Sequence, residues 1–135
     1  PKCKQCGKYL TKLYMYINDA ECYRCNNEIK YAYIMSQTGN TVRGHGNHLY
    51  PEGFTKDEIN LARSNGVVLK KRYSNTSAYT YLANSCHSCN TFIGNHYMFI
   101  DYISQEDYDE SEKNKRDIGY QCEYCNRIEE EKRWS

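Results

Sequence analysis

Eight cysteines, arranged as four C-x-x-C pairs, constrain this chain more than any other feature of its sequence. The pairs are Cys3/Cys6, Cys22/Cys25, Cys86/Cys89 and Cys122/Cys125. The two residues between the cysteines of a pair allow a tight turn, here called a knuckle, that directs both sulfur atoms to one metal ion. Two zinc ions with four thiolate ligands each would use all eight cysteines.

The residue that follows each pair supports this interpretation. These residues are Gly7, Asn26, Asn90 and Asn126. A knuckle commonly places the next residue in the left-handed backbone conformation, which Gly and Asn adopt at the lowest cost. We therefore predict two zinc ions as cofactors. Both are expected to be structural, because an all-cysteine site leaves no position open for a reactive water molecule.

Other uses of the cysteines are less consistent with the pattern. Disulfides or redox-active dithiols would need an oxidising compartment or a thioredoxin-like βαβ setting, and the sequence indicates neither. An iron–sulfur cluster also takes four thiolates, but repeated short knuckles suit zinc better. The spacing leaves three groupings of the knuckles open: sequential, nested or interleaved.

Composition explains why a chain of 135 residues would need such sites. Aliphatic side chains are few, and fifteen tyrosines supply much of the apolar surface. Metal sites would then supply part of the folding free energy that a large apolar core supplies in other proteins. The prediction is a single domain, residues 1–135, with a small β-rich α+β zinc-ribbon-like fold stabilised by two four-cysteine zinc sites. The sequence shows no apolar run of roughly 18 residues and no secretion signal, so we expect a cytoplasmic protein without a membrane segment.

Local patterns place the secondary structure. Residues 1–35 are predicted to contain two knuckles separated by a hairpin-like stretch, because residues 10–17 and 29–35 are β-prone. Thr55-Lys56-Asp57-Glu58 is a capping box that opens a helix through about residue 64, where Asn65-Gly66 ends it. Residues 67–73 and 78–83 predict two strands that lead to the third knuckle. Residues 92–103 are expected in the core, residues 104–107 begin a second helix, and residues 36–54 form a long loop that is either functional or disordered.

The charges are distributed unevenly along the chain. Residues 61–100 contain four basic residues and no acidic one, whereas residues 101–135 carry a net charge of −5. Basic residues interleaved with aromatic ones can hold single-stranded nucleic acid. The candidate nucleic-acid-binding residues are Arg63, Lys70, Lys71, Arg72 and Tyr73. Alternatively, these side chains guard a solvent-facing sheet edge, or the acidic C-terminal segment folds over them. Two zinc–tetrathiolate sites would lower the formal charge from +1 to about −3, which argues against general polyanion binding.

One catalytic hypothesis arises from the histidines. Cys86-His87-Ser88-Cys89-Asn90 resembles the C-x-x-C-N stretch of many HNH nucleases. In such an enzyme His45 or His48 would be the general base, with Asn90 and His96 near a divalent metal. The sequence Gly44-His45-Gly46-Asn47-His48 departs from the Asp-His or His-His pair of that family, so these histidines could instead lie in a solvated glycine-rich loop. No small-molecule substrate is predicted.

A second resemblance covers residues 20–103. Cys22-Tyr23-Arg24-Cys25, followed by Tyr81-Leu82-Ala83-Asn84-Ser85-Cys86 and by Ile93-Gly94, resembles small uncharacterised zinc-ribbon proteins of bacteria and bacteriophages. The resemblance implies that Cys22, Cys25, Cys86 and Cys89 share one zinc ion within a core of residues 20–103. The terminal knuckles, in residues 1–19 and 104–135, would then form the second site, which is the nested grouping. It implies no activity.

These observations favour a non-enzymatic zinc-binding adaptor or regulator that binds a protein or nucleic-acid partner, and the resemblance favours a bacterium or phage as its source. The alternatives are an HNH-like nuclease that uses His45 or His48, and a structural subunit of a larger assembly. The three classes differ in metal-dependent cleavage, in nucleic-acid binding and in the stability of the isolated chain.

Overall fold

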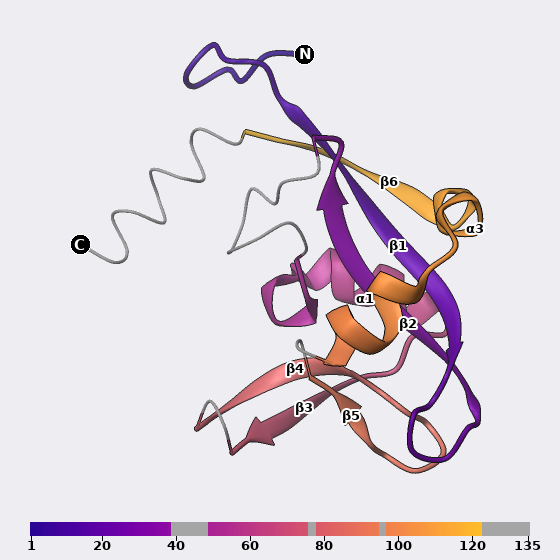
Figure 1. Ribbon diagram of the computed structural model, residues 1–135. Coiled ribbons are helices and arrows are strands. Elements are labelled where there is room, and N and C mark those ends of the chain that lie inside the picture. The colour runs from indigo at the N-terminus through magenta and orange to yellow at the C-terminus, as the bar shows by residue number, and fades with distance from the viewer. Residues whose placement is uncertain (39–48, 76–77, 95–96, 123–135) are drawn as a thin grey trace.

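The computed structural model of the chain describes residues 1–38, 49–75, 78–94 and 97–122 (Figure 1). These residues form two three-stranded antiparallel sheets and a few short helices. The β-rich architecture expected from the sequence is thus confirmed. No helix within the described residues is long and apolar enough to cross a membrane.

The first sheet has the strand order β2-β1-β6. Strands β1 (Thr11–Glu21) and β2 (Glu28–Ser36) cover the two segments predicted to be β-prone. They form a hairpin whose turn is the second knuckle, and not a hairpin that lies between the first two knuckles as expected. Strand β6 (Lys115–Gln121) pairs with the other edge of β1, from Thr11↔Gln121 to Tyr16↔Lys115. The sequence analysis missed β6, because this charged segment lacks the alternation of apolar residues that marks a half-buried strand.

The second sheet has the order β3-β4-β5. Strands β3 (Leu69–Ser74) and β4 (Tyr79–Ser85) match the two predicted strands closely. The third knuckle connects β4 to the short strand β5 (Phe92–Ile93). Each sheet therefore contains one hairpin whose turn is a cysteine knuckle, and Figure 1 shows these two turns next to each other.

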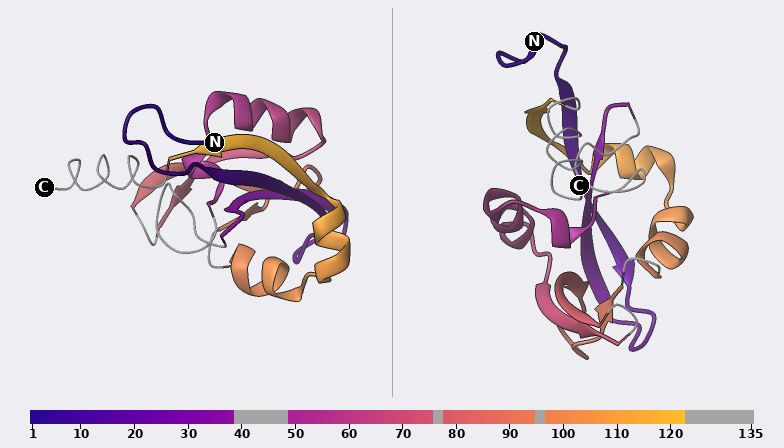
Figure 2. Two further views of the ribbon diagram at one scale, coloured as in Figure 1. Left: turned by 90° about the horizontal axis from the view of Figure 1, so that it is seen from above. Right: turned by 90° about the vertical axis from the view of Figure 1, so that its left-hand side faces the viewer.

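The helices lie beside the sheets (Figure 2). Helix α1 (Lys56–Ser64) has the predicted capping box, in which the Thr55 side chain accepts from the Glu58 backbone and the Glu58 side chain accepts from the Thr55 backbone. Gly66, with φ of +91°, follows its C-cap as expected. The other helices are η1 (Pro51–Gly53), the π-helix η2 (Met98–Tyr102), η3 (Ile103–Gln105) and α3 (Tyr108–Lys113).

The core consists of an aliphatic and an aromatic part. The aliphatic cluster joins β1, β2, β3 and α1, and includes Met15, Ile34 and Leu69. The aromatic cluster surrounds the second and third knuckles, and contains Tyr16, Cys22, Ile29, Tyr31, Tyr33, Cys86, Ile93, Met98 and Tyr102. The prediction that residues 92–103 belong to the core is only partly right, since the surface helix η2 leaves Phe99 46% and Ile100 45% exposed.

An amide side chain, that of Asn84, connects the edge of the first sheet to the second sheet. Asn84 is buried, its Oδ1 accepts from the Ala32 backbone N–H at 2.9 Å, and its Nδ2 donates to the Ala32 carbonyl at 3.1 Å. The Asn84 side chain thereby makes the two hydrogen bonds with Ala32 that a neighbouring strand would otherwise make along this edge of β2. Because unpaired backbone groups are costly inside a protein, the contact fixes how the two sheets meet.

Candidate metal centres and nucleic-acid interface

The second and third knuckles meet at one place. The sulfur atoms of Cys22, Cys25, Cys86 and Cys89 all lie within 4.8 Å of one another. Cys22 and Cys86 are buried, whereas Cys89 lies at the surface. This is the nested grouping, and it arises because the two hairpin turns carry one knuckle each.

The backbone of the described knuckles follows one repeating pattern. The N–H of the first cysteine donates to the carbonyl of the fifth residue after it: Cys3 to Lys8, Cys22 to Asn27 and Cys86 to Thr91, at 2.7 to 2.8 Å. The residue after the second cysteine donates back to the first, as from Asn26 to Cys22 and from Asn90 to Cys86. Gly7, Asn26 and Asn90 have φ of 77°, 64° and 62°. The left-handed conformation predicted for these three residues is thus confirmed, and Asn126 lies outside the described residues.

The sulfur positions fit a single metal ion. Cys22 Sγ lies 3.7 Å from Cys89 Sγ, and Cys25 Sγ lies 3.5 Å from Cys86 Sγ. Zn–S bonds of about 2.3 Å in a tetrahedron place the sulfur atoms roughly 3.8 Å apart, whereas a disulfide requires about 2.05 Å. A multi-iron cluster would need its thiolates spread over separate irons. The donor set and its spacing are therefore compatible with one soft, tetrahedral metal ion.

The thiols of this group have different pKa values. Burial raises the pKa of Cys22 to about 11. The side chain and then the backbone of Thr91 lower the pKa of Cys89 to about 6 by hydrogen bonding. A hydrogen bond with the Asn27 backbone lowers the pKa of Cys25. The exposed edge of the group therefore favours the thiolates that a metal requires, and a bound cation would deprotonate the buried thiol as well.

A second cluster joins the N-terminal knuckle to the end of β6. Cys3, Cys6 and Cys122 have their sulfur atoms within 4.8 Å of one another, and Cys6 Sγ lies 3.5 Å from Cys122 Sγ. The pairing Thr11↔Gln121 explains this meeting, since it brings the residues before β1 next to those after β6. The predicted fourth ligand, Cys125, lies outside the described residues. The structure thus contains two cysteine clusters compatible with metal binding.

The nuclease candidates are not brought together in the described part of the chain. His45, His48 and His96 lie outside it. His87 is exposed, with Nε2 3.1 Å from the Glu28 carbonyl oxygen. Asn90 follows a knuckle, accepts from Lys70 Nζ at Oδ1 (2.6 Å) and from Arg72 at its backbone carbonyl (2.9 Å). Both of its oxygen atoms therefore contact basic side chains.

The predicted basic residues divide between two faces of the second sheet. Side chains alternate along a strand, so Lys70 and Arg72 lie on one face and Lys71 and Tyr73 on the other. Arg63, on α1, donates to the Leu69 carbonyl at 2.9 Å. The five predicted residues therefore do not form one surface.

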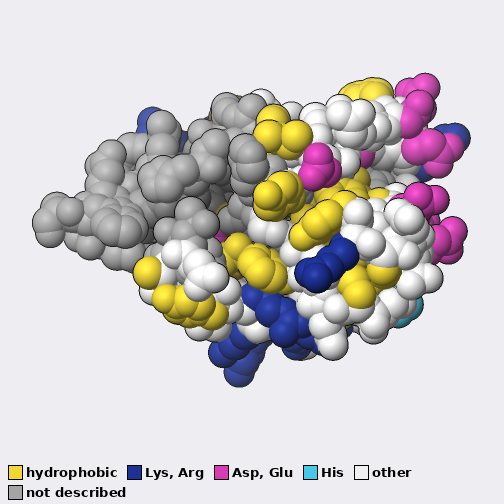
Figure 3. All heavy atoms as spheres, turned by 60° about the horizontal axis from the view of Figure 1, so that its bottom comes forward, with side chains coloured by type: hydrophobic (Ala, Val, Ile, Leu, Met, Phe, Trp, Pro, Cys, Tyr) yellow, Lys and Arg dark blue, Asp and Glu magenta, His cyan; other side chains and the backbone are white. Residues whose placement is uncertain are grey.

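The face that carries Lys70 and Arg72 also carries aromatic rings. The register places Tyr79, Tyr81 and Phe92 on this side, which we call the basic–aromatic face. The Tyr81 ring centroid lies 5.6 Å from that of Tyr79 and 6.2 Å from that of Phe92. Viewed from the side of this sheet, Lys and Arg side chains gather beside hydrophobic ones, and acidic side chains gather elsewhere (Figure 3). One carboxylate is close, since Tyr79 OH donates to Glu52 at 3.2 Å.

The two sheets differ in whether their lysines form ion pairs. Each lysine of the first sheet has its Nζ close to a carboxylate oxygen: Lys12 with Asp117 at 2.7 Å, Lys30 with Asp19 at 2.6 Å, and Lys115 with Glu112 at 2.5 Å. Within the described residues, none of Lys70, Lys71 and Arg72 forms an ion pair. Arg72 Nε is moreover buried without an acceptor in that part of the chain. The acidic residues up to Cys122 therefore do not neutralise the basic sheet, as the sequence had allowed.

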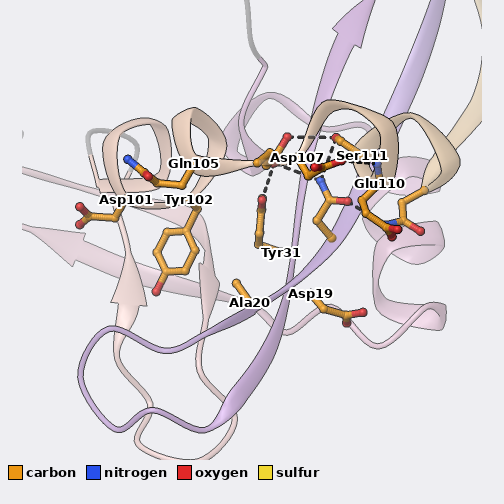
Figure 4. A pocket seen from close by; sticks show the side chains of 12 residues that line it. Asp19, Ala20, Tyr31, Asp101, Tyr102, Gln105, Asp107, Glu110 and Ser111 are labelled. Carbon is orange, nitrogen blue, oxygen red and sulfur yellow. Dashed lines mark hydrogen bonds between the residues drawn. The ribbon is translucent and has the colours of Figure 1, made fainter.

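A hollow of about 360 Å³ beside β1 and α3 has the opposite character (Figure 4). No Lys or Arg lines it, and five acidic residues do: Asp19, Asp101, Glu106, Asp107 and Glu110. Glu106 accepts from Tyr33 OH at 2.7 Å, from Asn18 and Ser111 at 3.0 Å, and from Tyr31 OH. Burial first, and then the Glu106 contact, raises the pKa of Tyr31 and of Tyr33. This network anchors residues 106–111 to the first sheet, a role that sequence reasoning missed because no motif marks it.

Comparisons with protein-family models, with curated proteins and with solved structures found no match for this chain.

Proposed function

We propose that this chain is a non-enzymatic module, held together by two structural zinc ions, that binds single-stranded nucleic acid through its basic–aromatic face. Zinc suits the two cysteine clusters because thiolates at tetrahedral spacing are its preferred structural ligands. In this proposal the cysteines Cys3, Cys6, Cys122 and Cys125 hold the second ion. The ions supply folding free energy and take no part in a reaction.

The observation that carries the proposal is the lack of carboxylate partners for the cations of the second sheet in the described residues. Phosphate groups supply most of the binding energy of nucleic acid, and they require cations that are not already neutralised. Lys70 and Arg72 meet this condition beside Tyr79, Tyr81 and Phe92. Of these rings Tyr79 is exposed and the other two are half-buried. Accessible aromatic rings favour single strands, since the bases of a duplex are already stacked on each other.

A titration of the zinc-loaded chain with fluorescent oligonucleotides tests this proposal. We expect a single strand of about 20 nucleotides to bind more tightly than the same sequence as a duplex. Between about 50 and about 200 mM salt, log K should fall with a slope of roughly −1.4 to −2.8, as for two to four phosphate contacts. Fluorescence anisotropy measures both quantities.

Three results would contradict the proposal. One is the absence of binding to any single strand at the lowest salt concentration. The second is equal or stronger binding to the duplex. The third is cleavage of the oligonucleotide in the presence of Mg²⁺ or Mn²⁺, which would instead support the nuclease and would have to depend on His45 or His48.

A further inference from the structure

A second hollow lies where the two knuckles of the first metal centre meet the second sheet. It has a volume of about 330 Å³ and is lined by Tyr23, Arg24, Arg72, Cys89, Asn90, Thr91 and Phe92. We call it the knuckle hollow. Small-molecule sites begin at about 300 Å³, so the space suits one nucleotide unit rather than a larger group. No acidic side chain lines it.

The aromatic part of the knuckle hollow is open to a ligand. Tyr23 is 50% exposed, and its ring stacks on that of Tyr97, which is 53% exposed, with 5.9 Å between centroids and 16° between planes. Phe92 lies on the other hairpin and packs against Tyr81. An exposed ring such as that of Tyr23 is costly to leave in water and provides a stacking surface for a base.

The polar part of the knuckle hollow is cationic and donates hydrogen bonds. Arg24 and Arg72 have no carboxylate within ion-pair distance in the described residues, and Arg72 Nε lacks an acceptor there. Lys70 can only donate, so the Asn90 atom that faces it at 2.6 Å is the amide oxygen. The amide nitrogen of Asn90 is thus left to donate to an acceptor on a ligand. Arginine forks and amide donors recognise phosphate and base or sugar oxygens.

We propose that the knuckle hollow is a nucleotide subsite for single-stranded nucleic acid, in which one base stacks on Tyr23 and the adjoining phosphate contacts Arg24 and Arg72. This inference rests on the proposed function and extends it from a charged face to a site that senses the base. Tyr23 and Arg24 lie between Cys22 and Cys25, and Asn90 follows Cys89. The metal centre therefore assembles the subsite from two hairpins.

The test compares a single-stranded oligonucleotide with one of equal length whose bases are replaced by abasic sites. We expect Tyr23→Ala to weaken binding of the normal strand about 5- to 100-fold, as for the loss of one stacked base, and to leave the abasic strand unaffected. Tyr23→Phe keeps the ring and should bind like the wild type. Tyr108→Ala is the matched control, because Tyr108 is 75% exposed on α3 at the acidic side.

The Tyr23→Ala variant is expected to fold, because the hydrogen bond between Tyr23 and Tyr102 does not use the Tyr23 side chain. The Tyr23 backbone N–H donates to Tyr102 OH at 3.0 Å, and alanine keeps this donor. Zinc content equal to that of the wild type verifies this. If Tyr23→Ala bound the normal strand as tightly as the wild type, or lost equal affinity for both strands, the subsite would be refuted while the proposed function stood. If the wild type bound neither strand, both proposals would be refuted.

Discussion

The two sheets have the same number of strands and opposite electrostatic designs. In the β2-β1-β6 sheet every lysine is paired with a carboxylate, whereas the described part of the chain offers no such partner to the cations of the β3-β4-β5 sheet. Exposed ion pairs contribute little to stability, so the pairing chiefly neutralises the first sheet. Within the described residues, the lysines of the first sheet are thus neutralised and its Arg116 contacts only amide oxygens, of Asn65 and of the Asn114 backbone. The second sheet differs because none of its cations has a carboxylate partner there, so its positive charge stays available to an external anion.

The two hollows repeat this contrast. The acidic hollow near β1 and α3 would repel phosphate, while the knuckle hollow contains two guanidinium groups and no carboxylate. A weakly charged chain can therefore bind a polyanion locally, because charge within a Debye length of about 10 Å matters more than the net value.

The two cysteine clusters, which are the proposed metal centres, also differ in what they connect. The centre formed by Cys22, Cys25, Cys86 and Cys89 joins a hairpin of one sheet to a hairpin of the other. The centre that contains Cys3, Cys6 and Cys122 closes one end of a single sheet, next to the Thr11↔Gln121 pair. The first should therefore control the fold, and the second should control mainly the edge strand β6.

The largest expected effect comes from Cys86→Ser. This change removes a buried cysteine from the cluster that connects the two sheets. In the zinc-loaded chain that we propose, the lost zinc ion would supply folding free energy comparable to the whole stability of a domain, about 5–15 kcal/mol. We expect the loss of one zinc ion per chain and of the cooperative melting transition. Metal analysis and circular dichroism measure both.

Cys122→Ser is the matched comparison. It should also lose one zinc ion but keep the first centre and a cooperative transition at a lower temperature. A Cys86→Ser chain with full zinc and an unchanged melting curve would contradict the assignment of that centre. Equal damage from both variants would contradict the division of roles.

A smaller effect is expected from Asn84→Ala, which removes a contact between the two sheets and leaves every cysteine in place. The change leaves the Ala32 N–H and carbonyl without their partners, at about 1–3 kcal/mol for each buried group. We predict that the free energy of unfolding falls by about 2–4 kcal/mol in urea titrations, with zinc content unchanged. Asn60→Ala, at an exposed position of α1, is the control and should change it by less than about 0.5 kcal/mol. Equal effects of the two variants would show that Asn84 does not join the sheets.

Local chemistry explains what the sequence could predict. Knuckles, the capping box at Thr55 and the left-handed residues Gly7, Asn26 and Asn90 depend on contacts within a few residues, and each was found where it was expected. The resemblance, rather than the spacing, favoured the nested grouping that brings Cys22 and Cys86 together.

Features that depend on partners distant in the sequence were harder to predict. Strand β6 exists because β1 offers it an edge, and its own sequence is that of a charged coil. The role of Asn84 requires Ala32, 52 residues away. The division of Lys70 and Lys71 between two faces needed only the strand register, and strict alternation along residues 69–74 could have predicted it.

The most direct test of the account removes the same charge from each sheet. We compare single-strand binding of Lys70→Gln/Arg72→Gln with that of Lys12→Gln/Lys30→Gln, over a salt series and at equal zinc content. The first pair should weaken binding roughly tenfold or more and reduce the salt slope by about 1.4, because two phosphate contacts are lost. The second pair should bind nearly as the wild type does. Equal losses from both pairs would show that only net charge matters, and would contradict the division of the molecule into a neutralised sheet and a binding sheet.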